Sequence, residues 1–156
     1  MRSPREMHGP APRSARAAAG PGDAAVDALV EEARLARSNA YAPYSNFLVG
    51  AAVLTEMGMF RGANVENASY GLAICAERVA AVTAVAAGTR DIDVVAVTSS
   101  AVEATPPCGA CRQFLYEFNP HMIVVSEGTG GSRKRWLLSD LLVDGFGPSD
   151  LGIERP

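Results

Sequence analysis

The sequence contains few of the residues that bind metals or cross-link small secreted domains. Among its 156 residues there are three cysteines and two histidines. Three cysteines cannot all pair with one another, and a leftover thiol is a liability in an oxidising compartment. The count therefore favours a reducing compartment, which indicates a cytoplasmic protein, and it makes metal binding the better use of the thiols.

Basic residues and long apolar runs are also scarce. Lysine and arginine number 14 against 17 acidic residues, which gives a net charge of -3. Nucleic-acid binding needs a basic face, so we expect no nucleic-acid partner. No apolar run approaches the ~18 residues of a transmembrane helix, so we expect no membrane partner either. The 48% hydrophobic and 20% charged content is typical of one globular domain with a substantial core.

The first 22 residues differ in composition from the rest. They hold four prolines, little that could be buried, and four of the fourteen basic residues, namely Arg2, Arg5, Arg13 and Arg16. This predicts a disordered N-terminal extension over residues 1–22, followed by a single domain over residues 23–156. The extension lacks the apolar centre of a secretory signal. Its arginine-rich character is faintly typical of a transit peptide, but an unstructured leader is the favoured interpretation.

Hydrophobic patterning predicts alternating helices and strands. We expect helices over residues 23–38, 72–87 and 108–118, strands over 47–55, 59–65, 93–99 and 122–126, and a last strand near 136–138 with a short helix after it. Asp23 and Ser139 are predicted to cap the first and last helices. The turn at 56–58 makes an antiparallel hairpin, whereas strand–helix–strand units give parallel strands. The order predicts an α/β fold, a three-layer α/β/α sandwich around a mixed five-stranded sheet.

The three cysteines fit the pattern of a catalytic zinc site. Cys108 and Cys111 are one turn apart at the start of a predicted helix, and Cys75 lies near the start of another. A structural zinc site has four protein ligands, whereas a catalytic site has three and leaves the fourth position for water. Glu77, two residues after Cys75, is a proton acceptor of the kind that such a water needs.

Three thiolates carry more negative charge than one zinc ion can balance, which would make the metal a poor Lewis acid. Arg78 and Arg112 are placed to offset this charge. We expect Arg78 to hydrogen-bond a thiolate sulfur, and Arg112 is the weaker candidate. Helix N-termini near the thiols would also lower their pKa values.

Each element has an ordinary interpretation when it is taken alone. A single C-x-x-C is often a redox pair or half of a structural zinc site, and a lone cysteine on an apolar helix usually packs in a core. A redox pair does not account for Cys75, and a structural site needs a fourth ligand, for which His8 and His121 are poorly placed. The combination favours a catalytic zinc site.

Two segments around the cysteines are Cys75-Ala76-Glu77-Arg78 and Pro107-Cys108-Gly109-Ala110-Cys111. They resemble the zinc-binding segments of the cytidine deaminases, and in particular those of the small, homotetrameric branch with three cysteine ligands. The residues at 41–47, 64–70 and 146–151 are also similar to family segments. The similarity covers roughly residues 23–151. The leader and the loop at 128–135 depart from the family pattern, and we expect neither to touch the chemistry.

The resemblance implies zinc-dependent hydrolytic deamination of cytidine and deoxycytidine to uridine, deoxyuridine and ammonia, in pyrimidine salvage. One zinc ion per subunit would be held by Cys75, Cys108 and Cys111. Glu77 would carry protons from the attacking water to ring N3 and then to the departing amine. Backbone amides at Ala76 and Glu77 would orient the base. The remaining substrate contacts would come from Phe47, beside the nucleoside, and from Asn64 and Glu66, on the ribose hydroxyls.

Tyr70 and Phe146 match family positions that reach the active site of a neighbouring subunit, which implies a homotetramer with shared sites. From pattern alone, Phe47 would be a core aromatic, Asn64 and Glu66 polar hairpin residues, and Phe146 a hydrophobic plug. Three other functions stay open: deamination of another cytosine-bearing small molecule such as a nucleoside antibiotic, nucleic-acid editing, and a non-catalytic zinc-binding module. The net charge argues against editing, and Glu77 argues against a structural module.

Overall fold

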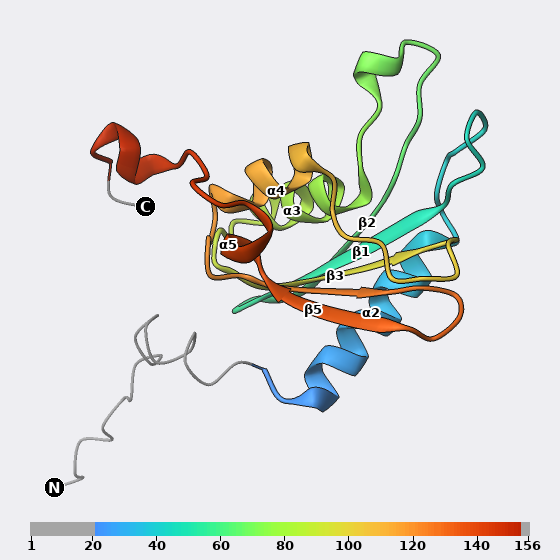
Figure 1. The fold of residues 1–156 in the computed structure, drawn as a ribbon, viewed down its shortest axis with the longest axis horizontal. Coiled ribbons are helices and arrows are strands. Elements are labelled where there is room, and N and C mark those ends of the chain that lie inside the picture. Colours follow the sequence, from blue (N-terminus) through green and yellow to red (C-terminus); the bar gives the residue numbers. More distant parts are fainter. Residues whose placement is uncertain (1–20, 154–156) are drawn as a thin grey trace, which may run out of the picture.

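The computed structural model describes residues 21–153, so most of the predicted N-terminal extension lies outside the described residues. The chain forms, in order, α2 (Asp23–Arg37), β1 (Val49–Thr55), β2 (Gly58–Ala63), η1 (Tyr70–Leu72), α3 (Ala76–Ala86), β3 (Ile92–Ser99), α4 (Gly109–Tyr116), β4 (Ile123–Glu127), β5 (Arg133–Leu137), α5 (Leu138–Leu141) and η2 (Pro148–Leu151) (Figure 1). None of the helices in this part of the chain is long and apolar enough to cross a bilayer.

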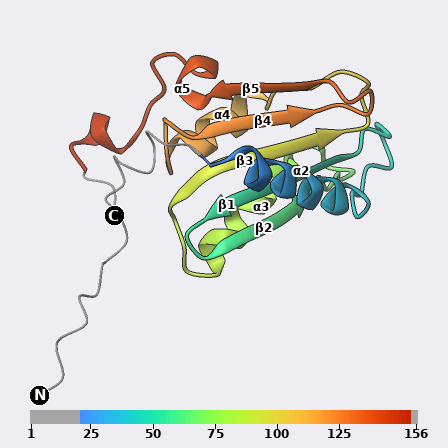
Figure 2. The same ribbon diagram turned by 90° about the horizontal axis from the view of Figure 1, so that it is seen from below.

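The strands form one mixed sheet in the order β2-β1-β3-β4-β5. β3 and β4 are parallel, and the other neighbouring pairs are antiparallel. Helix α2 covers one face of the sheet, and α3 and α4 cover the other (Figures 1 and 2). The predicted three-layer sandwich with a mixed five-stranded sheet is therefore confirmed.

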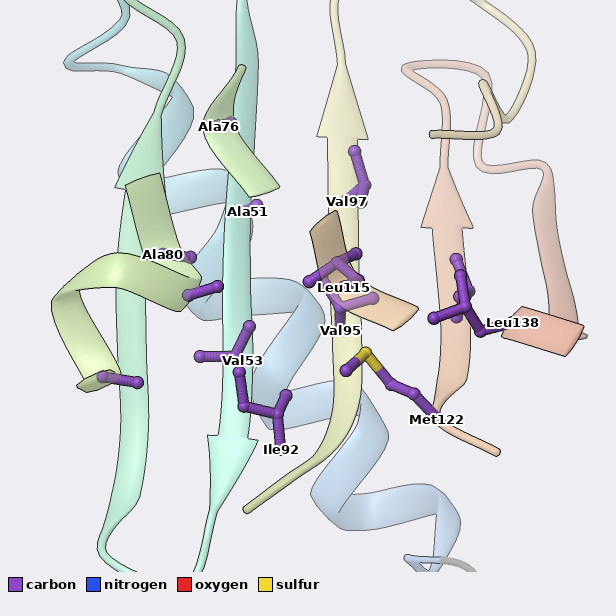
Figure 3. Close-up of a cluster of buried hydrophobic side chains, with 13 residues drawn as sticks. Ala51, Val53, Ala76, Ala80, Ile92, Val95, Val97, Leu115, Met122 and Leu138 are labelled. Carbon is purple, nitrogen blue, oxygen red and sulfur yellow. The ribbon is translucent and has the colours of Figure 1, made fainter. Parts of the chain in front are cut away.

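Both faces of β3 are buried, which explains its nearly continuous apolar sequence. Val95 and Val97 point into the cluster beneath α3 and α4, where Leu115 and Met122 also lie (Figure 3). Alternate residues of the same strand contact α2 in a second cluster. The helices on both faces of the sheet therefore pack against buried hydrophobic clusters.

Helix α3 approaches the sheet closely because β2 carries a glycine there. A Cβ atom on Gly62 would lie 2.3 Å from the backbone nitrogen of Ala80 and 2.5 Å from the carbonyl oxygen of Ala76. No side chain fits in that space. The first turn of α3, which follows Cys75, is therefore held directly against the sheet.

Several predicted element boundaries were wrong, and each has a local cause. Helix α3 begins at Ala76 rather than at residue 72, because paired hydrogen bonds between Val65 and Ile74 keep the preceding chain extended. Asp23 is the first helical residue after Gly22 and does not cap α2, although its charge suits the helix dipole. Leu137, rather than Ser139, precedes the first residue of α5.

Strand β5 is longer than predicted, since it begins at Arg133 instead of residue 136. Its first three residues are all basic, which hid the strand from an analysis of hydrophobic pattern. It is an edge strand that pairs only with β4, and charged residues are common on such edges.

Candidate active site

The three cysteines meet where the N-termini of α3 and α4 come together. Cys75 is the N-cap residue of α3, Cys108 is the N-cap residue of α4, and Cys111 is buried in the first turn of α4. Their sulfur atoms all lie within 4.8 Å of one another, and the Sγ atoms of Cys75 and Cys108 are 3.8 Å apart. The structure thus brings together three residues that are up to 36 positions apart in the sequence.

The pKa values of two of the thiols are shifted in opposite directions. A hydrogen bond from Cys111 lowers the pKa of Cys75 to about 5, and the guanidinium of Arg78 acts in the same direction. The same hydrogen bond, together with burial, raises the pKa of Cys111. Within the cluster, Cys75 is thus the thiol whose ionised form is favoured, and Cys111 the one whose protonated form is favoured.

The two arginines that flank the cysteines have different contacts. A terminal nitrogen of Arg78 lies 3.8 Å from the Sγ atom of Cys75 and 3.4 Å from the carbonyl oxygen of Ala73. Arg112 instead donates to the carbonyl oxygens of Pro107 and Leu141, each at 2.8 Å. Arg78 thus lies where the charge-balancing prediction requires a cation, whereas Arg112 joins the start of α4 to α5.

Glu77 is a buried carboxylate beside the cysteines. It is the second residue of α3, and only 4% of its surface is exposed. Burial raises its pKa above the ordinary value of 4.5, and the negative charge of Cys75 adds to this rise. A carboxyl group with a raised pKa can both accept and return a proton near neutral pH.

A cavity of about 270 Å³ opens next to this cluster. It is lined by six of the site residues that were predicted from the sequence, which are Phe47, Asn64, Glu66, Cys75, Glu77 and Cys108. The cavity is mostly apolar, with its few polar groups at the cysteine end and at the end of β2. Such a combination is typical of a small-molecule site.

The side chains of Asn64 and Glu66 are tied to the loop that enters β1. The Asn64 amide accepts a hydrogen bond from the Val49 N–H and donates to the Phe47 carbonyl oxygen, both at 2.8 Å. Glu66 accepts hydrogen bonds from the backbone N–H of Tyr44 at 2.8 Å and from the Ser45 hydroxyl, which lowers its pKa. Both residues therefore shape the cavity wall that contains Phe47.

The comparisons with known proteins agree with this geometry. Residues 24–127 match the family model described as the cytidine and deoxycytidylate deaminase zinc-binding region. A cytidine deaminase from Halalkalibacterium halodurans is 46% identical over 125 residues, which cover 79% of this chain and 95% of that protein.

Solved structures give the same result. The crystal structure of cytidine deaminase from Burkholderia pseudomallei is 48% identical, with a TM-score of 0.74 over 77% of this chain and 98% of that one. Cytidine deaminase from Mycobacterium tuberculosis is 36% identical, with a TM-score of 0.67 over 78% and 97% of the two chains. The chain belongs to the cytidine deaminase family.

The cysteine cluster has the geometry that zinc in this family requires. Two sulfur ligands of a tetrahedral zinc ion, with bonds of about 2.3 Å, lie about 3.8 Å apart. This spacing matches the separation of the Cys75 and Cys108 sulfur atoms. The donor set fits one zinc ion per subunit and leaves one position open, as in a catalytic centre.

Tyr70 and Phe146, which were predicted to reach the active site of a neighbouring subunit, lie on the surface. The exposed fractions of Tyr70 and Phe146 are 76% and 59%. Within the described part of the chain, neither lines the cavity beside the cysteines. Tyr70 instead borders a second hollow of about 320 Å³ with Tyr44, whose ring centroid is 6.0 Å away. The Phe146 carbonyl oxygen accepts a hydrogen bond from Gln113 of α4, at 2.6 Å.

Two polar residues that line the cavity were not predicted from the sequence. Ser99 ends β3, and Thr105 lies just before the two prolines that lead to Cys108. Both line the cavity, and their hydroxyl oxygens are 3.1 Å apart. The signal that was available is position, because ligands bind beyond the carboxyl ends of parallel strands and Ser99 is the last residue of one.

Proposed function

We propose that the chain is a zinc-dependent hydrolase that deaminates cytidine and deoxycytidine to uridine and deoxyuridine, with release of ammonia. The single observation that carries this proposal is the buried carboxylate of Glu77 in a cavity that is also lined by Cys75 and Cys108, two of three convergent cysteines. A structural zinc site has no use for a carboxylate in that place. Family membership and the nucleoside-sized cavity support the same reaction.

The reaction replaces the C4–N bond of cytosine by a C4–O bond. Cys75, Cys108 and Cys111 would hold the zinc ion, which would supply Lewis acidity to the water molecule that attacks C4. Glu77 accepts one proton of that water and delivers it to ring N3; it then takes the remaining proton from the new C4 hydroxyl group and gives it to the amine, which leaves as ammonia while C4=O forms. One carboxyl group serves both transfers because each restores the state that the other needs.

The rest of the cavity binds and orients the nucleoside. The Ala76 N–H lies in the first turn of α3, where backbone donors lack intrahelical partners and are free for the base. Phe47 supplies an apolar surface beside the nucleoside, and Asn64 and Glu66 supply polar groups for the ribose hydroxyls. Arg78, against the Cys75 sulfur, reduces the excess negative charge of the thiolates.

We also propose that the enzyme is a cytoplasmic homotetramer of pyrimidine salvage. The exposed aromatic side chains of Tyr70 and Phe146 support shared active sites, because large exposed aromatics are typical of interfaces. Reduced cysteines support a reducing compartment.

The proposal is tested by following the ultraviolet absorbance of cytidine with purified protein and with Glu77→Gln. We expect wild-type protein to produce uridine and to stop when a tight chelator is added. The variant should retain zinc and its fold but lose about 10³-fold or more in kcat, because a general acid and base is removed. Glu56→Gln, in the exposed β1–β2 turn, is the matched control. Retained turnover by Glu77→Gln would refute the mechanism.

A further inference from the structure

The loop of the β4–β5 hairpin packs against residues 101–104, a segment that leads directly into the cavity-lining residues Thr105 and Pro106. Thr129 donates its backbone N–H to the Ala101 carbonyl oxygen at 2.8 Å, and the Gly130 N–H donates to the Val102 carbonyl oxygen at 3.0 Å. On the other side of the loop, the Ser132 hydroxyl accepts from the Ala104 N–H at 2.9 Å. Three residues of the hairpin loop thus form hydrogen bonds with the segment at residues 101–104.

The approach is so close that it depends on a glycine. A Cβ atom on Gly128 would lie 2.1 Å from the carbonyl oxygen of Val102 and 2.5 Å from the carbonyl carbon of Glu103. Neither neighbour is a movable side-chain end, because both are backbone atoms. Any side chain at Gly128 therefore has to push the wall segment away from the hairpin.

The end of β4 continues the same contact toward the cavity. The buried hydroxyl of Ser126 donates to the Thr105 carbonyl oxygen at 2.7 Å, and the Thr105 hydroxyl lies 3.1 Å from that of Ser99. Ser99, Thr105 and the following residue, Pro106, line the cavity. A displacement at residues 101–105 would therefore change the shape of the pocket.

The hairpin is itself anchored firmly. Glu127, between Ser126 and Gly128, is buried and accepts hydrogen bonds from Arg34 of α2 and Arg133 of β5. Burial raises the pKa of its carboxyl group, but the hydrogen bonds of the two arginines outweigh this and lower it overall. The ionised Glu127 thus keeps the base of the hairpin fixed to the sheet and to α2.

We propose that the β4–β5 hairpin is a positioning element for the nucleoside pocket. It acts through Ser126, Gly128, Thr129 and Ser132 on the wall segment, residues 101–106, whose last two residues line the cavity. This inference rests on the proposed function and reverses the expectation that the loop at 128–135 is remote from the chemistry. The Pro107 carbonyl oxygen is held separately by Arg112 at 2.8 Å, so the Cys108 ligand is fixed independently of the wall. The hairpin therefore affects nucleoside binding more than the chemical step.

The first test is Gly128→Ala, with Gly131→Ala as the matched control. Gly131 lies in the same turn at a φ of +79°, and an added Cβ would have no neighbour within 4 Å. Both variants strain the hairpin, but only Gly128→Ala pushes on the wall. We expect Gly128→Ala to raise the KM for cytidine about tenfold or more with little change in kcat or zinc content, because small misplacements weaken binding strongly. The Kd for uridine, measured by calorimetry, should rise in parallel.

A milder variant covers the case in which Gly128→Ala fails to fold. Ser126→Ala removes the hydrogen bond to the Thr105 carbonyl oxygen and should raise the KM about fivefold. Its control is Thr98→Val, which removes a buried hydroxyl that has no hydrogen-bond partner among the described residues. The control should leave the KM unchanged.

Amide hydrogen exchange separates this inference from the proposed function. Exchange at the amides of residues 101–105 should accelerate in Gly128→Ala and Ser126→Ala whether or not the protein deaminates cytidine. If wild-type protein does not turn over cytidine, the proposed function fails while this result still tests the hairpin. Unchanged exchange in both variants, or equal changes of KM in the variants and their controls, would overturn the inference.

Discussion

The metal side of the cavity and the second hollow that borders it, which we call the open side, are built differently. On the metal side, Cys75, Glu77 and Cys111 lie on the first turns of two helices that pack on the sheet, above the buried cluster of Figure 3. On the open side, Tyr44 and Tyr70 lie in segments that project from the body, and most of their surface faces solvent. The cysteine cluster and Glu77 are supported by the core, whereas the exposed aromatic rings of the open side are carried by loops.

The two sides also differ in how much of each is enclosed by a single chain. The metal side takes all its predicted residues from one chain and holds them within a few ångströms of one another. The open side presents exposed aromatic rings beside a second hollow, which is typical of a surface that another chain covers. Under the proposed function, changes on the metal side should abolish chemistry, and changes on the open side should weaken binding and assembly.

Replacing a ligand on the metal side should have the largest effect. Cys111→Ala removes a buried sulfur from the cluster, so we expect loss of bound zinc, deamination below about a thousandth of the wild-type rate, and lower thermal stability. Zinc analysis, the cytidine assay and thermal unfolding measure these effects. Wild-type protein stripped by a chelator is the comparison and should behave like the variant. One full equivalent of zinc in the variant would exclude Cys111 as a ligand.

A smaller effect is expected from the arginine beside the ligands. Arg78→Gln removes the positive charge near the Cys75 sulfur, and it should cost about 10–100-fold in zinc affinity or in kcat. Competition with a chelator and the cytidine assay measure the two quantities. The matched control is Arg61→Gln, on β2, whose guanidinium pairs with Glu32 at 3.0 Å away from the cluster. Unchanged zinc affinity and turnover in Arg78→Gln would show that the charge is balanced elsewhere.

The sequence was most informative where the pattern is local. Cys108 and Cys111 share one helical turn, and Glu77 follows Cys75 by two residues, so their spacing alone indicated a metal site with an adjacent carboxylate. The apolar run at residues 93–99 likewise indicated a strand, which is confirmed, and both faces of β3 are buried. The roles of the individual site residues remain predictions.

The features that were missed depend on contacts between distant segments. The start of α3 is set by the Val65–Ile74 bridge, and the start of β5 by its pairing with β4. The hydrogen bond from Ala104 to Ser132 joins positions 28 residues apart. Nothing in the local composition of the loop at 128–135 shows that it holds the cavity wall, because this contact exists only after β4 and β5 pair.

The smallest effect on chemistry is expected from Phe146, the other exposed aromatic residue that is predicted to reach a neighbouring subunit. Phe146→Ala removes an exposed ring from the segment that Gln113 holds over α4. We expect the assembly to weaken in light scattering and the KM for cytidine to rise about tenfold, since burying an aromatic ring contributes about 1.5–3 kcal/mol. Zinc content and the circular dichroism spectrum should stay at wild-type values.

The control for Phe146→Ala is Met57→Ala, in the β1–β2 turn. Its side chain is as exposed as that of Phe146, at 58% against 59%, so the two variants remove comparable amounts of exposed apolar surface. Only Phe146→Ala should change assembly and KM. A monomer that retains the wild-type KM would mean that one chain contains the whole nucleoside site, and the exposed aromatics would then need a different explanation.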